Sequence, residues 1–295
     1  MTFDEMTDRI ATGQGFIAAL DQSGGSTPKA LRGYGIDEGA WEGDDEMFAL
    51  IHQMRSRIVE SPCFGNGKVI GAILFEKTMD GESGGKPVPT RLAERGVVPF
   101  LKVDKGLEEE ANGVQLMKPM PDLEQLLDRA RAKGVFGTKM RSVIKANDPQ
   151  GIAAIVAQQF EEGKRILACG LMPILEPEYD ITAADRAEGE KVLLAEIMKH
   201  LDALRGGQQV MLKLSIPADA GLYAPAIAHP AVLRVVALSG GFSTDEACDK
   251  LAQNPGMIAS FSRGLLQDLR AQQDDAEFDR TLGAAIDRIH AASVA

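Results

Sequence analysis

Cysteine and histidine are scarce in this chain of 295 residues, which has three cysteines and four histidines. Cys63, Cys169 and Cys248 are odd in number and far apart, so they form neither a disulfide framework nor a zinc motif. No two histidines have the spacing of metal ligands. The sequence therefore predicts no metal site, and it indicates a reduced compartment.

Long hydrophobic runs and an excess of positive charge are also missing. No apolar run approaches the roughly 20 residues needed to cross a membrane, and the first residues do not form a signal segment. We therefore expect a cytoplasmic protein without a membrane partner. The net charge of −11 argues against nucleic acid as a partner, because binding it needs an excess of Lys and Arg. A phosphorylated metabolite can still be held by a local group of basic residues.

Eight short apolar runs alternate with longer amphipathic stretches. The runs are Phe16–Leu20, Val69–Phe75, Val98–Val103, Gly137–Arg141, Met172–Leu175, Val210–Leu214, Val235–Leu238 and Met257–Phe261. Such runs are typical of parallel strands covered on both faces. Their alternation with helical stretches favours an α/β fold, a (β/α)8 TIM barrel in which residues 1–295 form a single domain. The alternative is an open doubly wound sheet, but the G-x-G-x-x-G loop typical of that fold is missing after the first run.

The stretches between these runs carry helix signals. We expect helices over Asp44–Val59, Pro121–Lys133, Thr182–Leu204, Gly264–Gln272 and Glu277–Ala291. Asp148 has the form of an N-cap followed by proline, and Ser243 begins a capping box. Asp80–Lys86 and Lys105–Met120 are predicted to be loops.

Charged and hydroxyl residues lie at the ends of these apolar runs, where a barrel carries its reactive groups. Lys213 is the most informative of them, because a solvated lysine is unexpected within Val210–Leu214. Burial disfavours the charged form of a lysine. We expect Lys139 to point into the same mouth, where its charge would also disfavour the charged form of Lys213. A neutral amine is what attack on a ketone requires. The alternative is a lysine whose ammonium reaches the rim or pairs with a carboxylate.

Three carboxylates are candidates for proton transfer. Glu176 and Glu178 flank Pro177, and because side chains alternate along a strand we expect only one of the two to point fully inward. An inward carboxylate beside lysines suits proton transfer, or it serves as the structural partner of a buried lysine. Asp21, after the first run, can exchange a proton with a substrate hydroxyl.

Two groups of residues predict anion binding. The first follows the seventh and eighth runs, the usual phosphate site of such barrels, and comprises Ser239, Gly240, Gly241, Ser262 and Arg263. Glycines let backbone N–H groups approach an anion, the following helices present positive ends, and arginine adds a fork of donors. The second group lies across the mouth and comprises Ser23, Ser26 and Lys102. Two anion sites suggest a bisphosphorylated substrate.

Seven segments carry a resemblance to a known family, and they span nearly the whole chain. They are Ala18–Ser23, Lys102–Gly106, Thr138–Arg141, Glu176–Glu178, Leu212–Lys213, Leu238–Gly241 and Ser262–Arg263. In these segments and their order, the sequence resembles the class I fructose-1,6-bisphosphate aldolases, in particular their short bacterial branch. The resemblance implies reversible cleavage of fructose 1,6-bisphosphate to dihydroxyacetone phosphate and glyceraldehyde 3-phosphate, in glycolysis and gluconeogenesis. It implies a covalent Schiff base and no metal or other cofactor.

The resemblance also implies roles for individual residues. Lys213 matches the lysine that forms the Schiff base, and Lys139 matches the second active-site lysine. Glu176 matches the acid/base of carbinolamine formation and dehydration, and Asp21 matches the aspartate that handles the proton of the C4 hydroxyl. Arg141 matches a basic residue near the substrate chain. The phosphate-binding matches are Ser239, Gly240 and Arg263 for C1, and Ser23, Ser26 and Lys102 for C6.

The sequence departs from the family at several points. Met140 stands where many animal and plant members have tryptophan, and Ser262 where they have glycine. The last residues lack the C-terminal tyrosine of longer members, so Glu176, Glu178 or bound water would protonate the enamine carbon.

Three alternatives to this function stay open. The first is a Schiff-base aldolase for a tagatose bisphosphate or a sugar monophosphate. The second is a barrel that binds a phosphosugar or a protein without catalysis, and the third and poorest is a metal-dependent aldolase. The oligomeric state, a homo-oligomer included, and the preferred direction of the reaction also stay open.

Overall fold

The computed structural model describes residues 1 to 295, and eight parallel strands form its centre. In their order around the sheet these strands are β1 (Phe16–Leu20), β2 (Val69–Leu74), β5 (Val98–Lys102), β7 (Gly137–Ile144), β8 (Met172–Tyr179), β9 (Val210–Ser215), β10 (Val232–Leu238) and β11 (Met257–Ala259). The ring is nearly closed, because Ala19 N donates to Phe261 O, just beyond β11, at 3.3 Å. The predicted TIM barrel is confirmed, and the open doubly wound sheet is wrong.

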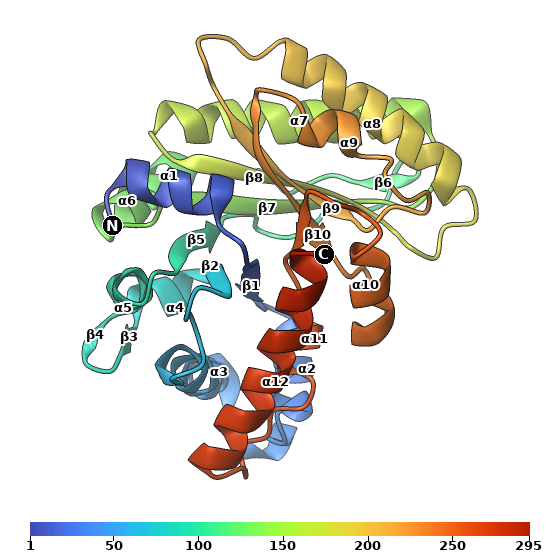
Figure 1. Ribbon diagram of the computed structural model, residues 1–295. Coiled ribbons are helices and arrows are strands. Elements are labelled where there is room, and N and C mark those ends of the chain that lie inside the picture. Colours follow the sequence, from blue (N-terminus) through green and yellow to red (C-terminus); the bar gives the residue numbers. More distant parts are fainter.

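Helices surround the strands (Figure 1). They are α1 (Phe3–Thr12), α2 (Ser26–Gly33), α3 (Gly43–Glu60), α4 (Glu76–Asp80), α5 (Val88–Glu94), α6 (Leu123–Ala132), α7 (Pro149–Ala168), α8 (Arg186–Asp202), α9 (Ala224–Ile227), α10 (Thr244–Leu251), α11 (Arg263–Leu266) and α12 (Asp275–Ser293). Helix α7 covers the side of β7 and β8 and has α8 beside it, and α12, red in Figure 1, packs against β1 and β11. None of these helices combines the length and the apolar character needed to cross a membrane.

Most residues of the strands are apolar, because each strand has two buried faces. Side chains alternate along a strand between the barrel interior and the layer under the helices. On β9, Met211 belongs to the interior cluster, whereas Leu212 and Leu214 belong to the large cluster packed against the helices. Lys213 therefore points to the same side as Met211, into the barrel and nearer its C-terminal mouth.

Both predicted helix caps are present. The Asp148 side chain accepts from Gly151 N at the start of α7, and Ser243 and Glu246 form the capping box of α10. Strands β7 and β8 are longer than predicted, because they pair in register from Gly137↔Met172 to Ile144↔Tyr179.

Short elements account for most of the other differences. Helices α1, α2, α4 and α5 were not predicted, and α11 ends at Leu266 rather than continuing through Gln272. The predicted loop Asp80–Lys86 contains β3 (Glu82–Ser83) and the start of β4 (Lys86–Pro87), which pair with each other. The second predicted loop contains β6 (Val114–Gln115), which pairs antiparallel with the extension of β7. Strands of two residues depend on such pairing and have no periodicity of their own.

Candidate active site

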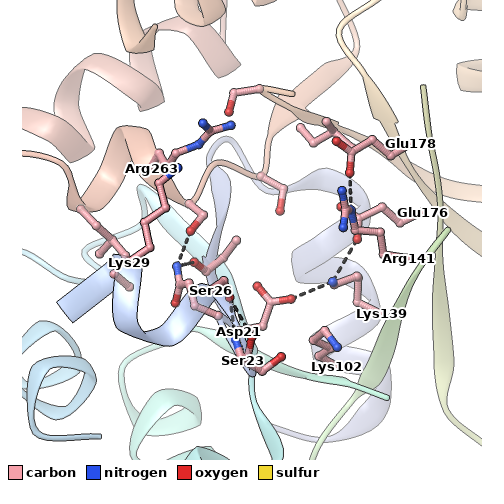
Figure 2. A pocket seen from close by; sticks show the side chains of 18 of the residues that line it. Asp21, Ser23, Ser26, Lys29, Lys102, Lys139, Arg141, Glu176, Glu178 and Arg263 are labelled. Carbon is pink, nitrogen blue, oxygen red and sulfur yellow. Dashed lines mark hydrogen bonds and ion pairs between the residues drawn. The ribbon is translucent and has the colours of Figure 1, made fainter. Parts of the chain in front are cut away.

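The predicted site residues surround one cavity of about 770 Å³ at the C-terminal mouth of the barrel (Figure 2). The cavity is lined by Asp21, Ser23, Ser26, Lys102, Lys139, Arg141, Glu176, Glu178, Lys213, Ser239, Gly240, Ser262 and Arg263. Of the predicted set, Gly241 does not line it. Side chains from β1, β5, β7, β8, β9 and the loops after β10 and β11 are thus brought together, as the carboxyl ends of parallel barrel strands require.

A carboxylate between two lysines forms the floor of the cavity. Glu176 Oε1 lies 3.0 Å from Lys213 Nζ, and Glu176 Oε2 lies 3.0 Å from Lys139 Nζ. Lys139 Nζ also lies 2.7 Å from Asp21 Oδ2 (Figure 2). Glu176 and Lys139 are each 3% exposed and Lys213 is 4% exposed. Charges this deeply buried persist because each has a partner of opposite sign.

These ion pairs control the protonation of the two carboxylates. Burial alone would raise the pKa of Asp21, but the charges of Lys139 and Lys213 lower it well below its usual range. The pKa of Glu176 is lowered by the same two cations against the same opposing effect of burial. Burial disfavours the charged form of Lys139, yet Asp21 and Glu176 raise its pKa. Both acids are therefore ionised near neutral pH, and Lys139 is charged.

Glu178 also faces the cavity, where it forms an ion pair with Arg141 Nε. The prediction that only one of Glu176 and Glu178 can point inward is wrong. Residues two apart on a strand share a face, and β8 continues through both of them. The charge of Glu178 also raises the pKa of Arg141, although burial opposes it.

The second predicted anion group lies at β1 and β5. Lys102 Nζ lies 2.7 Å from Asp104 Oδ1, and Asp104 Oδ2 accepts from Arg141 N at 3.2 Å. Ser26 Oγ accepts from Ser23 N at 3.0 Å and donates to Ser23 O at 2.9 Å, which folds the loop after β1 into a turn. Lys102 and the two serines thus line the cavity while being held by their own neighbours.

The first predicted anion group follows β10 and β11. Gly240 has a φ of +62°, which residues with a side chain rarely adopt. A Cβ at this position would lie 2.5 Å from Ile181 Cγ2. Arg263 and Lys102 lie at opposite sides of the cavity in Figure 2, whereas the loops that carry Ser23 and Ser262 are in contact, because Gln22 Nε2 donates to Ser262 Oγ.

The cavity is positive although the chain is negative. Seven Lys and Arg side chains line it against four carboxylates, whereas the whole chain has a net charge of −11. The excess of cations is what an anionic ligand requires.

The family model described as Glycolytic: Fructose-bisphosphate aldolase class-I matches residues 4–215, well over half of the chain. The chain belongs to the class I fructose-bisphosphate aldolase family. Class I aldolases are lyases that use a Schiff base and no metal. The matched region includes Asp21, Lys139, Glu176 and Lys213.

Solved structures with the same fold include an aldolase. The fructose-bisphosphate aldolase of Plasmodium falciparum has 18% identity and a TM-score of 0.79, and the match covers 99% of this chain and 94% of that one. The protein Cgl0159 of Corynebacterium glutamicum has 14% identity and a TM-score of 0.52, with 98% and 92% covered. At these identities the comparison shows the shared eight-stranded barrel fold.

Several residues that shape this aldolase-family site were missed from the sequence. Arg55 of α3, 1% exposed, donates to Gln22 O and to Gln22 Oε1, and Gln22 Nε2 donates to Ser262 Oγ. Lys29 and Arg270 add further cations to the cavity lining. Arg55 lies on a helix, so the search for charges at strand ends passed over it. Its one signal was an arginine on the apolar side of α3, next to Met54.

Proposed function

We propose that this protein cleaves fructose 1,6-bisphosphate reversibly into dihydroxyacetone phosphate and glyceraldehyde 3-phosphate, through a Schiff base on Lys213. The observation that carries the proposal is the Glu176 carboxylate held between Lys213 and Lys139 in the cavity. A buried lysine beside a proton acceptor has what a nucleophilic amine needs. Family membership supports the reaction class, and the excess of cations supports a phosphosugar as the ligand.

The first half of the proposed reaction builds the iminium. Glu176 accepts a proton from Lys213, 3.0 Å away, and the free amine attacks the C2 carbonyl. A C–N bond forms, the carbonyl electron pair moves to oxygen, and a proton moves from nitrogen to that oxygen. Protonated Glu176 then returns its proton to the hydroxyl, the C–O bond breaks, and water leaves.

The second half breaks the carbon–carbon bond. Asp21 takes the proton of the C4 hydroxyl, an aldehyde forms at C4, and the C3–C4 electron pair moves into the iminium to give an enamine. Protonation at C3, by Glu176, Glu178 or a bound water, and hydrolysis by water then release dihydroxyacetone phosphate and restore Lys213. Lys139 holds Asp21 and Glu176 in place and keeps both ionised between steps.

The two anion groups fit the ends of a bisphosphate. Ser239, Gly240 and Arg263 are proposed to bind the C1 phosphate, with Gly241 and Ser262 in the same two loops. Ser23, Ser26 and Lys102 are proposed to bind the C6 phosphate, and Arg141, which lines the same cavity, is proposed to contact the substrate chain. A cytoplasmic location stays a prediction, as does the absence of nucleic-acid and membrane partners, and the oligomeric state stays open.

Borohydride trapping tests the proposal. The protein is incubated with dihydroxyacetone phosphate and excess chelator, reduced with sodium borohydride, and the adduct is located by peptide mass spectrometry. We expect an adduct on Lys213 in the wild type and no adduct in Lys213→Met. Lys145→Met, which removes a lysine paired with Asp180 outside the cavity, should keep the adduct.

The outcome separates this proposal from its alternatives. No adduct on folded wild-type protein overturns the Schiff-base mechanism and favours a binding protein or a metal-dependent enzyme. With the adduct established, initial rates with fructose 1,6-bisphosphate, tagatose 1,6-bisphosphate and fructose 1-phosphate test the substrate. A rate that does not depend on the C6 phosphate would contradict the role of Ser23, Ser26 and Lys102.

A further inference from the structure

A buried glutamine of α7 joins the two strands that carry the central ion pairs. Gln159 is 1% exposed. Its Nε2 donates to Met140 O at 3.2 Å and to Ser142 Oγ at 2.8 Å, and its Oε1 accepts from Glu176 N at 3.2 Å. The partners on β7 flank Arg141, and the partner on β8 is Glu176 itself.

The surroundings of Gln159 are otherwise apolar. Ile155, Val156 and Phe160 of the same helix are buried in the large cluster between the strands and the helices. An amide in such a layer loses its water, so it stabilises the fold only through the hydrogen bonds it makes. An apolar side chain would fill the space without that requirement. The bonds to β7 and β8 are therefore what distinguishes Gln159 from its neighbours on α7.

The backbone at Glu176 needs such an anchor. The pairing of β8 with β9 ends at Leu175↔Leu212, one residue before Glu176 and Lys213. The next residue, Pro177, has no N–H to donate. Gln159 supplies an acceptor for the Glu176 N–H at the point where β8 loses β9 as a partner.

We propose that Gln159 is a positioning residue that holds the backbone of Glu176 against β7, so that its carboxylate stays between Lys213 and Lys139. The inference rests on the proposed Schiff-base function, in which Glu176 transfers protons. A shift of about 1 Å in a group that must meet reacting atoms can cost on the order of 100-fold in rate. The phosphate-binding groups lie on other elements, so Gln159 affects the chemical step and not substrate binding.

The adjacent residue provides a matched control. Gln158 also bonds through both ends of its amide, accepting from Met117 N at 2.9 Å and donating to Met117 O at 2.9 Å. Met117 lies in the segment between β6 and α6, outside the cavity lining. Gln158→Met and Gln159→Met therefore each remove one amide from the same helix, but only the second releases Glu176.

We expect Gln159→Met to lower kcat by about 10- to 100-fold and to leave KM within about twofold. Gln158→Met should leave both constants within about twofold. The pH profile of kcat is a second readout, one that a loss of stability alone does not move. Burial raises the pKa of Glu176 and the two lysines lower it, so a carboxylate that drifts from them regains a higher pKa. The acidic limb of the profile should therefore move to higher pH in Gln159→Met only.

The outcomes separate the two proposals. Wild-type protein without turnover and without an adduct on Lys213 overturns the proposed function, and this inference with it. If the wild type is active but Gln158→Met and Gln159→Met have the same kcat and the same pH profile, only the inference about Gln159 is overturned. If Gln159→Met does not fold, Ser142→Ala removes one partner of the amide. The inference is then supported if Ser142→Ala loses less kcat than expected for Gln159→Met and its acidic limb moves to higher pH. An unchanged pH profile in Ser142→Ala overturns the inference.

Discussion

At the scale of single residues, the central feature is one carboxylate that serves two lysines. Glu176 pairs through one oxygen with Lys213 and through the other with Lys139, and Asp21 takes a further position on Lys139. The negative charges of the two acids balance the positive charges of the two lysines, whereas a single charge buried without a partner would strongly destabilise the fold. Because Lys139 bonds to both acids, removal of Lys139 should be more costly than removal of a surface lysine.

We expect Lys139→Met to lower the free energy of unfolding by about 3–5 kcal/mol at neutral pH. Lys145 forms a more exposed ion pair with Asp180, so Lys145→Met should lower the free energy of unfolding by about 1 kcal/mol or less. Urea unfolding of both variants and the wild type measures the difference.

The effect of Lys139→Met should depend on pH with a definite sign. In the wild type the pKa values of Asp21 and Glu176 are lowered, so their contribution to stability is present above about pH 4 and is lost as the pH falls further. In the variant the charges of Asp21 and Glu176 are buried without the positive charge of Lys139, and this destabilises the folded state. Protonation of the two carboxylates removes that destabilisation. The difference in unfolding free energy between wild type and variant should therefore shrink as the pH falls from 7 toward about 4. An equal difference at both pH values would contradict this account.

At the scale of elements, the barrel depends on how its first and last strands are joined. Between them the backbone makes the bond from Ala19 to Phe261, and Gln22 adds a side-chain bond to Ser262. Arg55 of α3 fixes Gln22, and it also donates to Thr78 Oγ1 at 2.7 Å. Burial lowers the pKa of Arg55 to about 10 although Asp21 opposes the shift, so it stays charged at neutral pH. A helix outside the barrel thus holds the loop after β1 in place.

Two arginines of α3 allow this to be tested. Arg55→Met should raise KM for the phosphosugar several-fold, because the loop that carries Ser23 and Ser26 loses its anchor, and it should also lower the melting temperature. Arg57→Met removes bonds to Gln273 O and Asp275 near the start of α12 and one to Tyr34 Oη after α2, none of which lines the cavity, and it should lower the melting temperature alone. Equal changes of KM in the two variants would show that Arg55 does not act through the loop.

At the scale of the whole molecule, charge is distributed unevenly. The chain has a net charge of −11, yet cations outnumber carboxylates in the cavity by seven to four. Surface acids farther from the cavity than the Debye length, about 10 Å at 0.1 M salt, act weakly on a bound anion. The local cations therefore dominate its binding.

Salt should weaken the binding of a phosphosugar for this reason. Raising KCl from about 0.1 to about 0.5 M should increase KM several-fold and leave kcat largely unchanged, because screening acts on the anion more than on the buried ion pairs. Initial-rate measurements at matched pH test this. Arg263→Met should reduce the dependence on salt, and Arg280→Met, on the surface outside the cavity, should not. A KM that falls with salt would mean that repulsion by the acidic surface outweighs the cations of the cavity.

The sequence alone was enough to predict the barrel and the chemical groups in its mouth. Strands covered on both faces are mostly apolar, so the few charged residues in their C-terminal halves, such as Lys213 and Glu176, stand out against them. Helix signals were weaker for short elements, and α4 and α5 were missed because five to seven residues hold too few turns for a periodic pattern.

Only the tertiary structure decided how these groups pair. Arg55 and Gln22 are separated by 33 residues and Gln22 and Ser262 by 240, so their bonds leave no local pattern. The same holds for Gln159, which has the same side chain as its neighbour Gln158 but bonds to β7 and β8, whereas Gln158 bonds to Met117 between β6 and α6. The residue types at strand ends follow from burial, which acts locally along the chain. Their partners depend on register and closure, which exist only when distant strands have come together.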